Sequence, residues 1–432
     1  MNSAKDELQF QHLVLLIGEN PLPNFVAAKY FLDKDRKEKN LKNISVIHTK
    51  GKHGTEKNAE RLKLVLERMQ GCSVPFHFCD LEDQGNARQV ANDVLNKIPF
   101  GKNDTFHLNY TGGTKNMAVH AYLALFTHRS NHDFTNCSFS YLDAEDFLLK
   151  HDDGLPLSGD MRKEVNIDLE NLLLLHHCHK SHEDEIFDWP EANNALKAMI
   201  KDGSISKFIK WRNEVLRPLF YRRTPRGEQI EKPEAAITRQ QLEQHEAWQT
   251  IEPLLMQMLP ESQRWKFNDD GILDLGSSSH FKNEFKPGVE FLDGKWFEAF
   301  ALQEIRQAEL FSDGTFQIAS NWHIKRDGAD KTFELDIMIL YGYQLCGISL
   351  TTASDRRTCK SKAFEIMHRT RQIGGDEARS LLVTTNPAEK VEDLESDLLA
   401  DTGRQTNIKV FGLEQLREGQ LWTNIKEHMM KK

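Results

Sequence analysis

The stretch Phe106-His107-Leu108-Asn109-Tyr110-Thr111-Gly112-Gly113-Thr114-Lys115-Asn116-Met117-Ala118 decides the fold of the N-terminal part of the chain. An alternating apolar run ends in Thr-Gly-Gly-Thr-Lys and continues as an amphipathic pattern, which predicts a strand, a tight turn and a helix. Glycines let a backbone approach a phosphate closely, the helix start supplies free N–H groups, and Lys115 adds a charged donor. The turn is therefore predicted to bind an anion, although it lacks the GxxxxGK[ST] spacing of a Walker A loop.

Strand and helix patterns alternate before this turn. Strands are expected at 12–18, 43–49 and 74–81, and helical patterns follow them from about residue 24, over 55–70 and over 85–97. Such alternation predicts an α/β fold with a Rossmann-like parallel sheet, in which ligands bind beyond the carboxyl ends of the strands. No GxGxxG follows the first strand, which argues against a nicotinamide or flavin enzyme.

The prolyl loop after the first strand and the Thr-Gly-Gly-Thr-Lys turn after the fourth resemble a CARF domain, the CRISPR-associated Rossmann-type sensor. The resemblance covers about residues 1–155. It implies a homodimer that binds a cyclic oligoadenylate, cyclic tetra-adenylate or hexa-adenylate, across its two-fold axis. Three loops at the carboxyl edge of the sheet hold the candidate ligand-binding residues: Gly18, Glu19, Asn20, Pro21, Asn24, Thr49, Lys50, Thr55, Thr111, Gly112, Gly113, Thr114, Lys115 and Asn116.

Composition indicates a protein of more than one domain. A chain of 432 residues exceeds the usual size of a single core. The six cysteines form no CxxC pair, and the apolar run 13–17 is too short for a signal peptide, so we expect a cytoplasmic protein without membrane segments. The net charge of −9 neither predicts nor excludes nucleic-acid binding, because local patches matter more than the total.

Residues 156–270 are predicted to form a mostly helical connector. Basic and aromatic residues alternate in it, which suits a nucleic-acid backbone and its bases; the alternative is a solvated helix whose aromatic side chains face the core. The candidate nucleic-acid contacts are Lys207, Lys210, Arg212, Arg222 and Arg223.

The connector also contains His176-His177-Cys178-His179-Lys180-Ser181-His182. These residue types can bind zinc, but zinc sites usually join spaced pairs from different elements. Because the stretch is expected on one short helix after Leu172–Leu175, histidines packed at a domain junction are the preferred interpretation.

Residues 271–432 are predicted to form a second α/β domain. The pattern gives a helix at 294–310, strands at 315–324, 333–341 and 343–352, a helix at about 360–373 and a strand at 380–385. This order resembles the core of restriction-endonuclease-like enzymes of the PD-(D/E)xK type. Glu334 and Asp336 are two residues apart on a strand, so both carboxylates point to one face and suit Mg²⁺ or Mn²⁺.

The Glu-x-Lys motif that usually follows is replaced by Ser349-Leu350-Thr351. Lysines at the start of the next helix offer a compensation, and the resemblance to CARF-fused nucleases implies a further metal-side carboxylate at Glu298. Glu298, Glu334 and Asp336 are thus the expected metal ligands. The full set of candidate catalytic residues is Glu298, Glu334, Asp336, Ser349, Thr351, Lys360, Lys362 and Glu365.

Together, the resemblances imply a metal-dependent nuclease of type III CRISPR antiviral defence. It would be activated by a cyclic oligoadenylate and cleave DNA, RNA or both with little sequence preference. Two alternatives stay open. One is a metal-independent HEPN ribonuclease, since Arg239 and His245 fit the Arg-x4–6-His spacing. The other is a CARF-regulated transcription factor that uses the basic segment of the connector.

Overall fold

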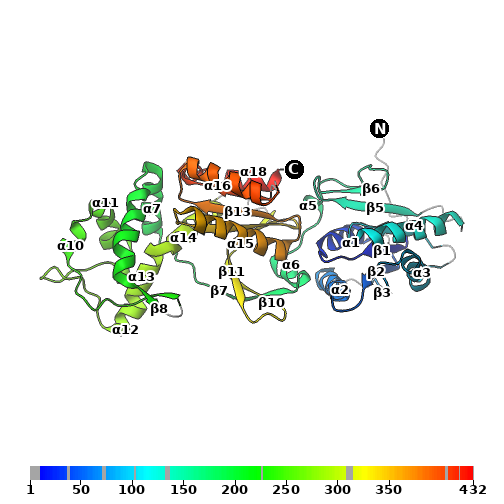
Figure 1. The fold of residues 1–432 in the computed structure, drawn as a ribbon, viewed down its shortest axis with the longest axis horizontal. Helices are drawn as coiled ribbons and strands as arrows, with labels where there is room; N and C mark the ends of the chain where they lie inside the picture. Colours follow the sequence, from blue (N-terminus) through cyan, green and yellow to red (C-terminus); the bar gives the residue numbers. More distant parts are fainter. Residues whose placement is uncertain are drawn as a thin grey trace.

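The computed structural model describes residues 10–36, 39–70, 74–101, 104–131, 137–224, 227–307, 315–403, 407–417 and 419–431. Three parts follow one another along the long axis of the molecule (Figure 1). The N-terminal sheet with α1–α4 lies at one end, the second sheet lies in the middle, and a helical lobe lies at the other end.

The first sheet has the strand order β3-β2-β1-β4-β5-β6. β1 to β5 run parallel, and β6 pairs antiparallel with β5 in a hairpin. The parallel Rossmann-like layout predicted from the alternating pattern is therefore confirmed. Its elements are β1 (His12–Leu16), α1 (Leu22–Asp35), β2 (Asn43–Thr49), α2 (Glu56–Gln70), β3 (Phe76–Leu81), α3 (Ala87–Lys97), β4 (Phe106–Asn109), α4 (Lys115–Asn131), β5 (Ser138–Asp143) and β6 (Leu148–His151).

The second sheet has the order β14-β13-β12-β11-β10-β7. β7, β10, β11 and β12 are antiparallel neighbours, whereas β12, β13 and β14 are parallel. The four strands and two helices expected between residues 294 and 385 are all present. The elements are β7 (Cys178–Glu183), α14 (Trp296–Arg306), β10 (Phe316–Arg326), β11 (Thr332–Tyr341), β12 (Gln344–Thr351), α15 (Arg356–Gly374), β13 (Arg379–Thr384), α16 (Ala388–Asp401), β14 (Ile408–Phe411), α17 (Leu413–Arg417) and α18 (Leu421–Met430).

The expectation of one short helix through the histidine-rich stretch is wrong. After α5 (Met161–Glu164), helix α6 (Leu169–Leu175) ends, and His177 adopts a left-handed conformation with φ of 58°. The chain then enters β7, which is the edge strand of the second sheet. A strand that lies inside the segment expected to be a connector therefore belongs to the C-terminal sheet.

The helical lobe is inserted between β7 and β10. Its core is rich in buried aromatic side chains, among them Phe208, Trp211 and Trp265. The lobe comprises α7 (Pro190–Asp202), α8 (Ile205–Trp211), α9 (Arg217–Phe220), the hairpin β8 (Tyr221–Thr224) and β9 (Gly227–Ile230), α10 (Arg239–Glu243), α11 (Trp248–Pro253), α12 (Ser278–His280) and α13 (Lys286–Glu290), with π-helical turns at 212–216, 254–258, 281–285 and 291–295.

Within the described ranges, no helix is both long enough and apolar enough to cross a membrane.

Candidate functional site

Three carboxylates converge on one face of the second sheet. Glu334 and Asp336 lie on β11, two residues apart, and Glu298 lies in the first turn of α14. Lys295, one turn before Glu298, joins the group: its Nζ lies 3.0 Å from Glu298 Oε2 and 3.6 Å from Glu334 Oε1. The predicted metal ligands are therefore brought together by a helix and a strand that lie far apart in sequence from each other.

Asp336 is held in place by the neighbouring strand. Its Oδ2 accepts hydrogen bonds from the Leu350 amide at 2.7 Å and from the Ser349 hydroxyl at 3.2 Å. Ser349 was predicted as a site residue, and the structure gives it the task of orienting a carboxylate. Thr351 accepts a hydrogen bond from the Ala353 amide, so its hydroxyl shapes the end of β12 instead.

The carboxylates are crowded and poorly hydrated. Burial, and then the negative charges of Asp336 and Glu334, raise the pKa of Glu298 to about 7, although Lys295 opposes the shift. Burial also raises the pKa of Asp336 above its ordinary value. Such shifts mark a place where negative charge is not fully balanced by the protein.

Lys295 is a site residue that was not predicted from the sequence. Burial disfavours its ammonium ion, but the surrounding carboxylates outweigh this cost, and the pKa of Lys295 is raised. The sequence spacing could have predicted this residue, since Lys295 stands three residues before Glu298 and therefore lies on the same helix face. In a chain without the usual Glu-x-Lys lysine, Lys295 is the lysine that contacts two of the carboxylates.

The lysines predicted at the start of α15 differ in their surroundings. Lys360 Nζ lies 2.7 Å from Asp401 and 3.9 Å from Asp397, both on α16, so its charge is directed away from the carboxylate cluster. Lys362 is exposed, lies 3.9 Å from Glu365, and contributes a favourable charge to the environment of Asp336. Of the two, Lys362 is the one whose charge reaches the site.

The cluster fits a hard divalent cation. Its donors are carboxylate oxygens, the ligands that Mg²⁺ and Mn²⁺ prefer. Glu334 Oε1 is buried and has no hydrogen-bond partner among the described residues, with Lys295 Nζ at ion-pair distance only. A buried oxygen without a hydrogen-bond partner, beside two carboxylates of raised pKa, is typical of a cation-binding site, because a bound cation would satisfy the oxygen and balance the negative charge.

The second candidate region lies where β1 and β4 end. A Cβ atom on Gly112 would collide with the carbonyl oxygen of Leu16, and one on Gly18 would lie 3.0 Å from the Gly113 amide nitrogen. Gly113 has φ of 77°, which favours glycine. The glycines are therefore required because the turn packs directly against the first loop, and they leave Thr114 and Lys115 exposed at the start of α4.

Several predicted ligand residues shape this region through their own side chains. Thr49 and Thr55 are buried, and each hydroxyl accepts a hydrogen bond from the other's amide at 3.1 Å. Asn24 is buried and donates to the Leu16 carbonyl. Thr111 donates to Asn109 and accepts from the Leu142 amide. The remaining predicted side chains here are Glu19, which is exposed, Pro21, which is buried, Lys50, which pairs with Asp80, and Asn116, which donates to the Gln84 carbonyl.

Asn20 connects the first loop to the second sheet. Its Nδ2 donates to Glu377 Oε2 at 3.1 Å, and its Oδ1 lies 3.3 Å from His176 Nε2. Asn58 makes a parallel link, since it donates to the carbonyl oxygens of Gly18 and Glu19 and its Oδ1 lies 2.7 Å from His177 Nε2. The prediction that these histidines pack at a domain junction is confirmed.

The basic segment 207–223 of the helical lobe offers fewer free basic side chains for binding a nucleic acid than its sequence suggests. Arg212 is buried and donates to the Asp293 carbonyl and to the Thr352 hydroxyl, so the prediction that it contacts a nucleic acid is wrong. The interleaved Phe208, Trp211 and Phe220 are buried, which confirms the alternative that these aromatic side chains face the core.

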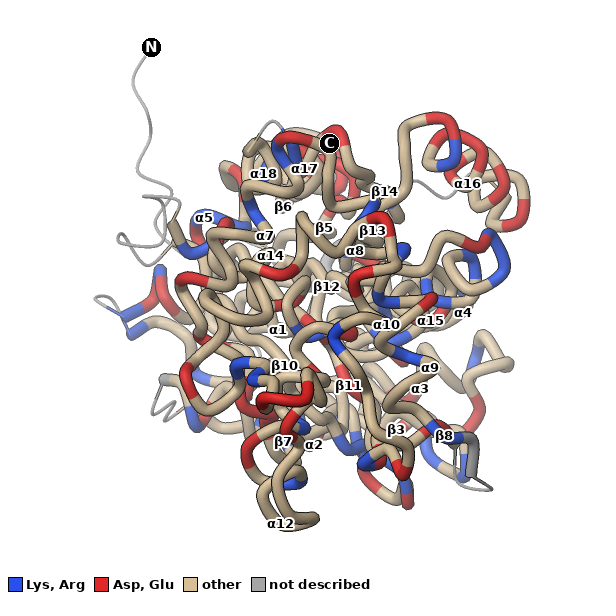
Figure 2. The backbone as a smooth tube through the Cα atoms, turned by 90° about the vertical axis from the view of Figure 1, so that its left-hand side faces the viewer, with Lys and Arg blue, Asp and Glu red and all other residues tan. Residues whose placement is uncertain are grey.

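The exposed basic residues of the segment are mixed with acidic ones. Lys210 pairs with Glu246 at 2.6 Å, Arg222 donates to the carbonyls of Pro218 and Tyr221, and Lys207 is exposed. The side chain of Arg223 lies outside the described residues. Figure 2 shows Lys and Arg interspersed with Asp and Glu over the coloured backbone at this end of the molecule.

The two residues of the HEPN alternative are paired with different acidic side chains. Arg239 pairs with Glu243 and Glu252, and His245 Nε2 lies 3.2 Å from Glu214. Arg239 is therefore engaged by two carboxylates and His245 by a third, all within the helical lobe.

Comparison with known proteins identifies a family match in the N-terminal part of the chain. Residues 12–137 match the family described as the Card1 CARF domain. No curated protein matches the sequence of the chain.

Two solved structures share the fold over nearly the whole length. The crystal structure of protein VC1899 from Vibrio cholerae aligns with a TM-score of 0.64 and 14% identity, covering 97% of this chain and 98% of that one. The structure of Can2 from Sulfobacillus thermosulfidooxidans in complex with cyclic tetra-adenylate aligns with a TM-score of 0.60 and 15% identity, covering 95% and 98%. The N-terminal part of the chain thus matches the Card1 CARF domain, and it is joined to a second α/β domain in an arrangement shared with these two proteins.

Proposed function

We propose that the chain is a nuclease effector of type III CRISPR defence, switched on by a cyclic oligoadenylate. The observation that carries the proposal is the cluster of Glu298, Glu334, Asp336 and Lys295 on the second sheet of a chain that also carries a CARF domain. The fold shared with the Can2 complex supports cyclic tetra-adenylate as the activator. A restriction-endonuclease-like reaction, the hydrolysis of a phosphodiester in DNA, RNA or both, suits this cluster best.

The residues of the carboxylate cluster and its neighbours would have different roles, which follow from their positions. Glu298, Glu334 and Asp336 would hold Mg²⁺ or Mn²⁺, which when bound supplies a polarised phosphate and a water of lowered pKa. Ser349 and the Leu350 amide fix the carboxylate of Asp336. Lys295 offsets charge between Glu298 and Glu334 and can donate to a phosphate oxygen. Lys362 places a second positive charge near Asp336 from the exposed side.

The same proposal assigns a route from the sensor to the nuclease. The turn 111–116 and the loop 18–24 would contact the cyclic oligoadenylate at the carboxyl edge of the first sheet. Asn20 and Asn58 hold this loop against Glu377, His176 and His177. Because β7 follows His177 directly and pairs with β10, a shift of the loop would be transmitted to the edge of the second sheet.

A homodimer formed through α4 completes the proposal. Val119, Leu123 and Phe126 are 52%, 50% and 43% exposed and repeat at positions i, i+4 and i+7 of this helix. A stripe of this kind on a helix suits the apolar face of another protein surface. A second copy of the chain would cover it and bring two ligand-binding turns together, as the CARF resemblance implies.

The test is cleavage of supercoiled plasmid and of single-stranded RNA by the full chain. Each substrate is incubated with Mg²⁺, Mn²⁺ or EDTA, with and without cyclic tetra-adenylate. We expect cleavage only where both a metal ion and the activator are present. Cleavage of RNA that persists in EDTA would overturn the metal-dependent mechanism, and complete inactivity under all conditions would favour the CARF-regulated transcription factor.

Two variants make the test specific. Glu334→Gln with Asp336→Asn removes two of the three carboxylate charges and should abolish cleavage. Glu389→Gln removes an exposed carboxylate on α16 and should leave cleavage unchanged. Loss of activity in both variants would show that the effect of the first is not specific to the cluster.

A further inference from the structure

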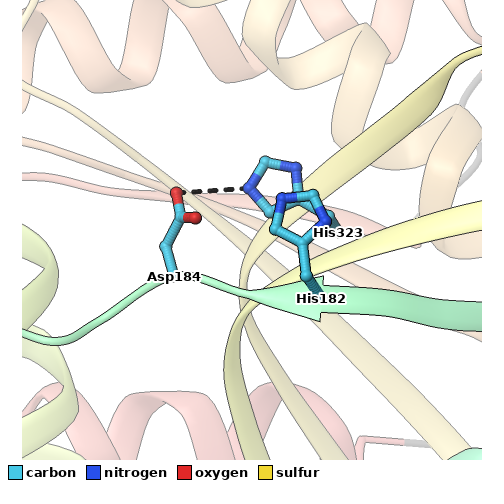
Figure 3. A group of neighbouring side chains, drawn as sticks. All are labelled: His182, Asp184 and His323. Carbon is cyan, nitrogen blue, oxygen red and sulfur yellow. Dashed lines mark ion pairs between the residues drawn. The ribbon is translucent and has the colours of Figure 1, made fainter.

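A second group of chemically active side chains lies at the edge of the second sheet. His182 and Asp184 come from β7 and the residue just past its end, and His323 comes from β10 (Figure 3). One nitrogen or oxygen atom of each lies within 4.8 Å of the others. The group is separate from the three carboxylates described above.

The strand geometry explains how these three side chains meet. Residues two apart along an extended chain point to the same side, which places His182 with Asp184. His182 is the cross-strand partner of His323. The register between β7 and β10 shifts after this pair, so that Ser181 is the extra residue of a bulge. A bulge of this kind sets the direction in which the flanking side chains point.

The rings are arranged with nitrogen atoms available for a ligand. The imidazoles of His182 and His323 are stacked, with centroids 4.0 Å apart and planes at 9°. His323 Nε2 lies 3.2 Å from Asp184 Oδ2 but, although buried, has no aligned hydrogen-bond partner among the described residues. His182 Nδ1 lies 3.3 Å from the Ser181 hydroxyl, which leaves its other nitrogen for a different partner. An ion pair with Asp184 needs only His323, so it does not account for the position of His182 beside them.

We infer that His182, Asp184 and His323 bind a divalent transition-metal ion, for which Zn²⁺ is the best match. Two imidazole nitrogens and one carboxylate oxygen are common zinc donors, and a three-residue set leaves a position open for water or substrate. In tetrahedral zinc sites neighbouring donor atoms are about 3.4 Å apart, given metal–ligand bonds of about 2.0–2.1 Å. His182 is exposed, so a rotation of its side chain can close the remaining gap.

The position of this site close to the carboxylate cluster would let a bound metal ion affect nucleic-acid cleavage. This consequence rests on the proposed function. His323 is paired on its other side with Glu334, so a row of side chains runs from His182 through His323 to a carboxylate of the cluster. A nitrogen-rich site and an oxygen-rich site therefore lie on neighbouring strands and select different metal ions. The zinc ion would place a second positive charge beside the cluster, where it can bind a phosphate of the nucleic-acid backbone.

Metal titration of the full chain tests the inference. The protein is freed of metal with a chelator and titrated with Zn²⁺ by calorimetry and with Co²⁺ by visible absorption. We expect one tight equivalent of metal per chain in the unaltered protein. His182→Ala and Asp184→Asn should each weaken binding at least about tenfold, the scale on which zinc sites respond to lost supporting groups. His179→Ala, an exposed histidine on the same strand, should bind as the unaltered protein does.

Two results would overturn the inference: no zinc binding by the unaltered chain, or unchanged binding in His182→Ala. Circular dichroism of each variant separates loss of a ligand from loss of the fold. The variant with both Glu334→Gln and Asp336→Asn should keep its zinc while losing cleavage. Failure of the proposed nuclease function would leave zinc binding intact, so the two outcomes are distinguishable.

Discussion

At the scale of single residues, we expect the proposed cleavage to depend on the lysine of the carboxylate cluster. Two candidate lysines lie on α15, yet Lys295 is the one in contact with Glu298 and Glu334. It occupies a position from which a charge on a bound phosphate can be offset. Variants of Lys295 and of Gly112 in the tight turn test these roles.

Replacement of Lys295 by Met is expected to reduce the cleavage rate by about 10²-fold or more, because removal of one preorganised charged group from an active site costs that order of magnitude. Initial rates on plasmid and RNA under activating conditions measure the effect. Lys360→Met is the matched control, since Lys360 pairs with Asp397 and Asp401 instead. Equal losses in the two variants would contradict the assignment, and a loss confined to Lys362→Met would transfer the role to that residue.

Gly112→Ala is expected to abolish binding of cyclic tetra-adenylate, because the added Cβ would collide with the Leu16 carbonyl and force the turn away from the first loop. Calorimetric titration with the activator measures this. Gly85→Ala, where a Cβ would meet only the flexible Asp83 side chain at 3.2 Å, should bind normally. Normal binding by Gly112→Ala would show that the close packing of the turn is not needed.

At the scale of elements, the junction between α6 and β7 couples the two sheets. His176 is buried at this junction and lies against Asn20 of the first loop. Its neighbour Glu377 is also buried, and burial raises the pKa of its carboxyl group. The junction therefore consists of hydrogen-bonded polar groups that join the loop 18–24 and α2 to the second sheet.

Asn20→Ala is expected to bind the activator with little change but to lose most of the activation of cleavage, because it removes the hydrogen bond to Glu377 and the contact with His176. Titration of the activator and cleavage rates, measured on the same preparation, separate the two effects. Asn40→Ala, in the exposed loop after α1, serves as the control. A parallel loss of binding and activation would instead make Asn20 a ligand contact.

Stability is expected to fall as the pH is lowered from 7 to 5. Burial lowers the pKa of His176 to about 4 and that of His107 to about 3. Because both values lie below the unfolded value of about 6.5, the unfolded chain binds protons first, and stability is lost as the pH falls through that value. Each of the two histidines is expected to lower the free energy of unfolding by about 2 kcal/mol between pH 7 and pH 5. Denaturation midpoints at both pH values measure the loss, and His176→Gln should flatten it; an unchanged slope would contradict the assignment.

At the scale of the whole molecule, the sensor and the carboxylate cluster belong to different parts of an elongated chain (Figure 1). The exposed stripe on α4 lies on the sensor, so association through it would join two chains at that end. Under the proposed function, activation by a ligand at the N-terminal domain would require that the change be passed through the junction to the second sheet.

Leu123→Glu is expected to convert a dimer into a monomer and to weaken binding of the activator, because a charge would be placed in the centre of the apolar stripe. Light scattering after size-exclusion chromatography gives the mass. Leu64→Glu alters an equally exposed leucine on α2, 44% against 50%, and should leave the mass unchanged. A monomer in the unaltered protein would overturn the dimer.

The sequence by itself determined the alternating strands and helices of the first sheet, the elements from α14 to β13 of the second domain and the turn at 111–116. These depend on local signals: apolar periodicity, glycine at a turn and carboxylates two residues apart on a strand. They also sufficed to place Glu334 and Asp336 on one face.

Only the tertiary structure decided which distant residues meet. Lys295 joined the carboxylates, Lys360 turned to α16, and Arg212 was buried, because each outcome depends on packing between elements that sequence spacing does not report. The histidine-rich stretch shows the same limit: its left-handed residue His177 ends the helix and starts an edge strand, whose partner β10 lies more than a hundred residues later in the chain. Pairing over such a distance is fixed by the burial of a whole sheet rather than by local propensity.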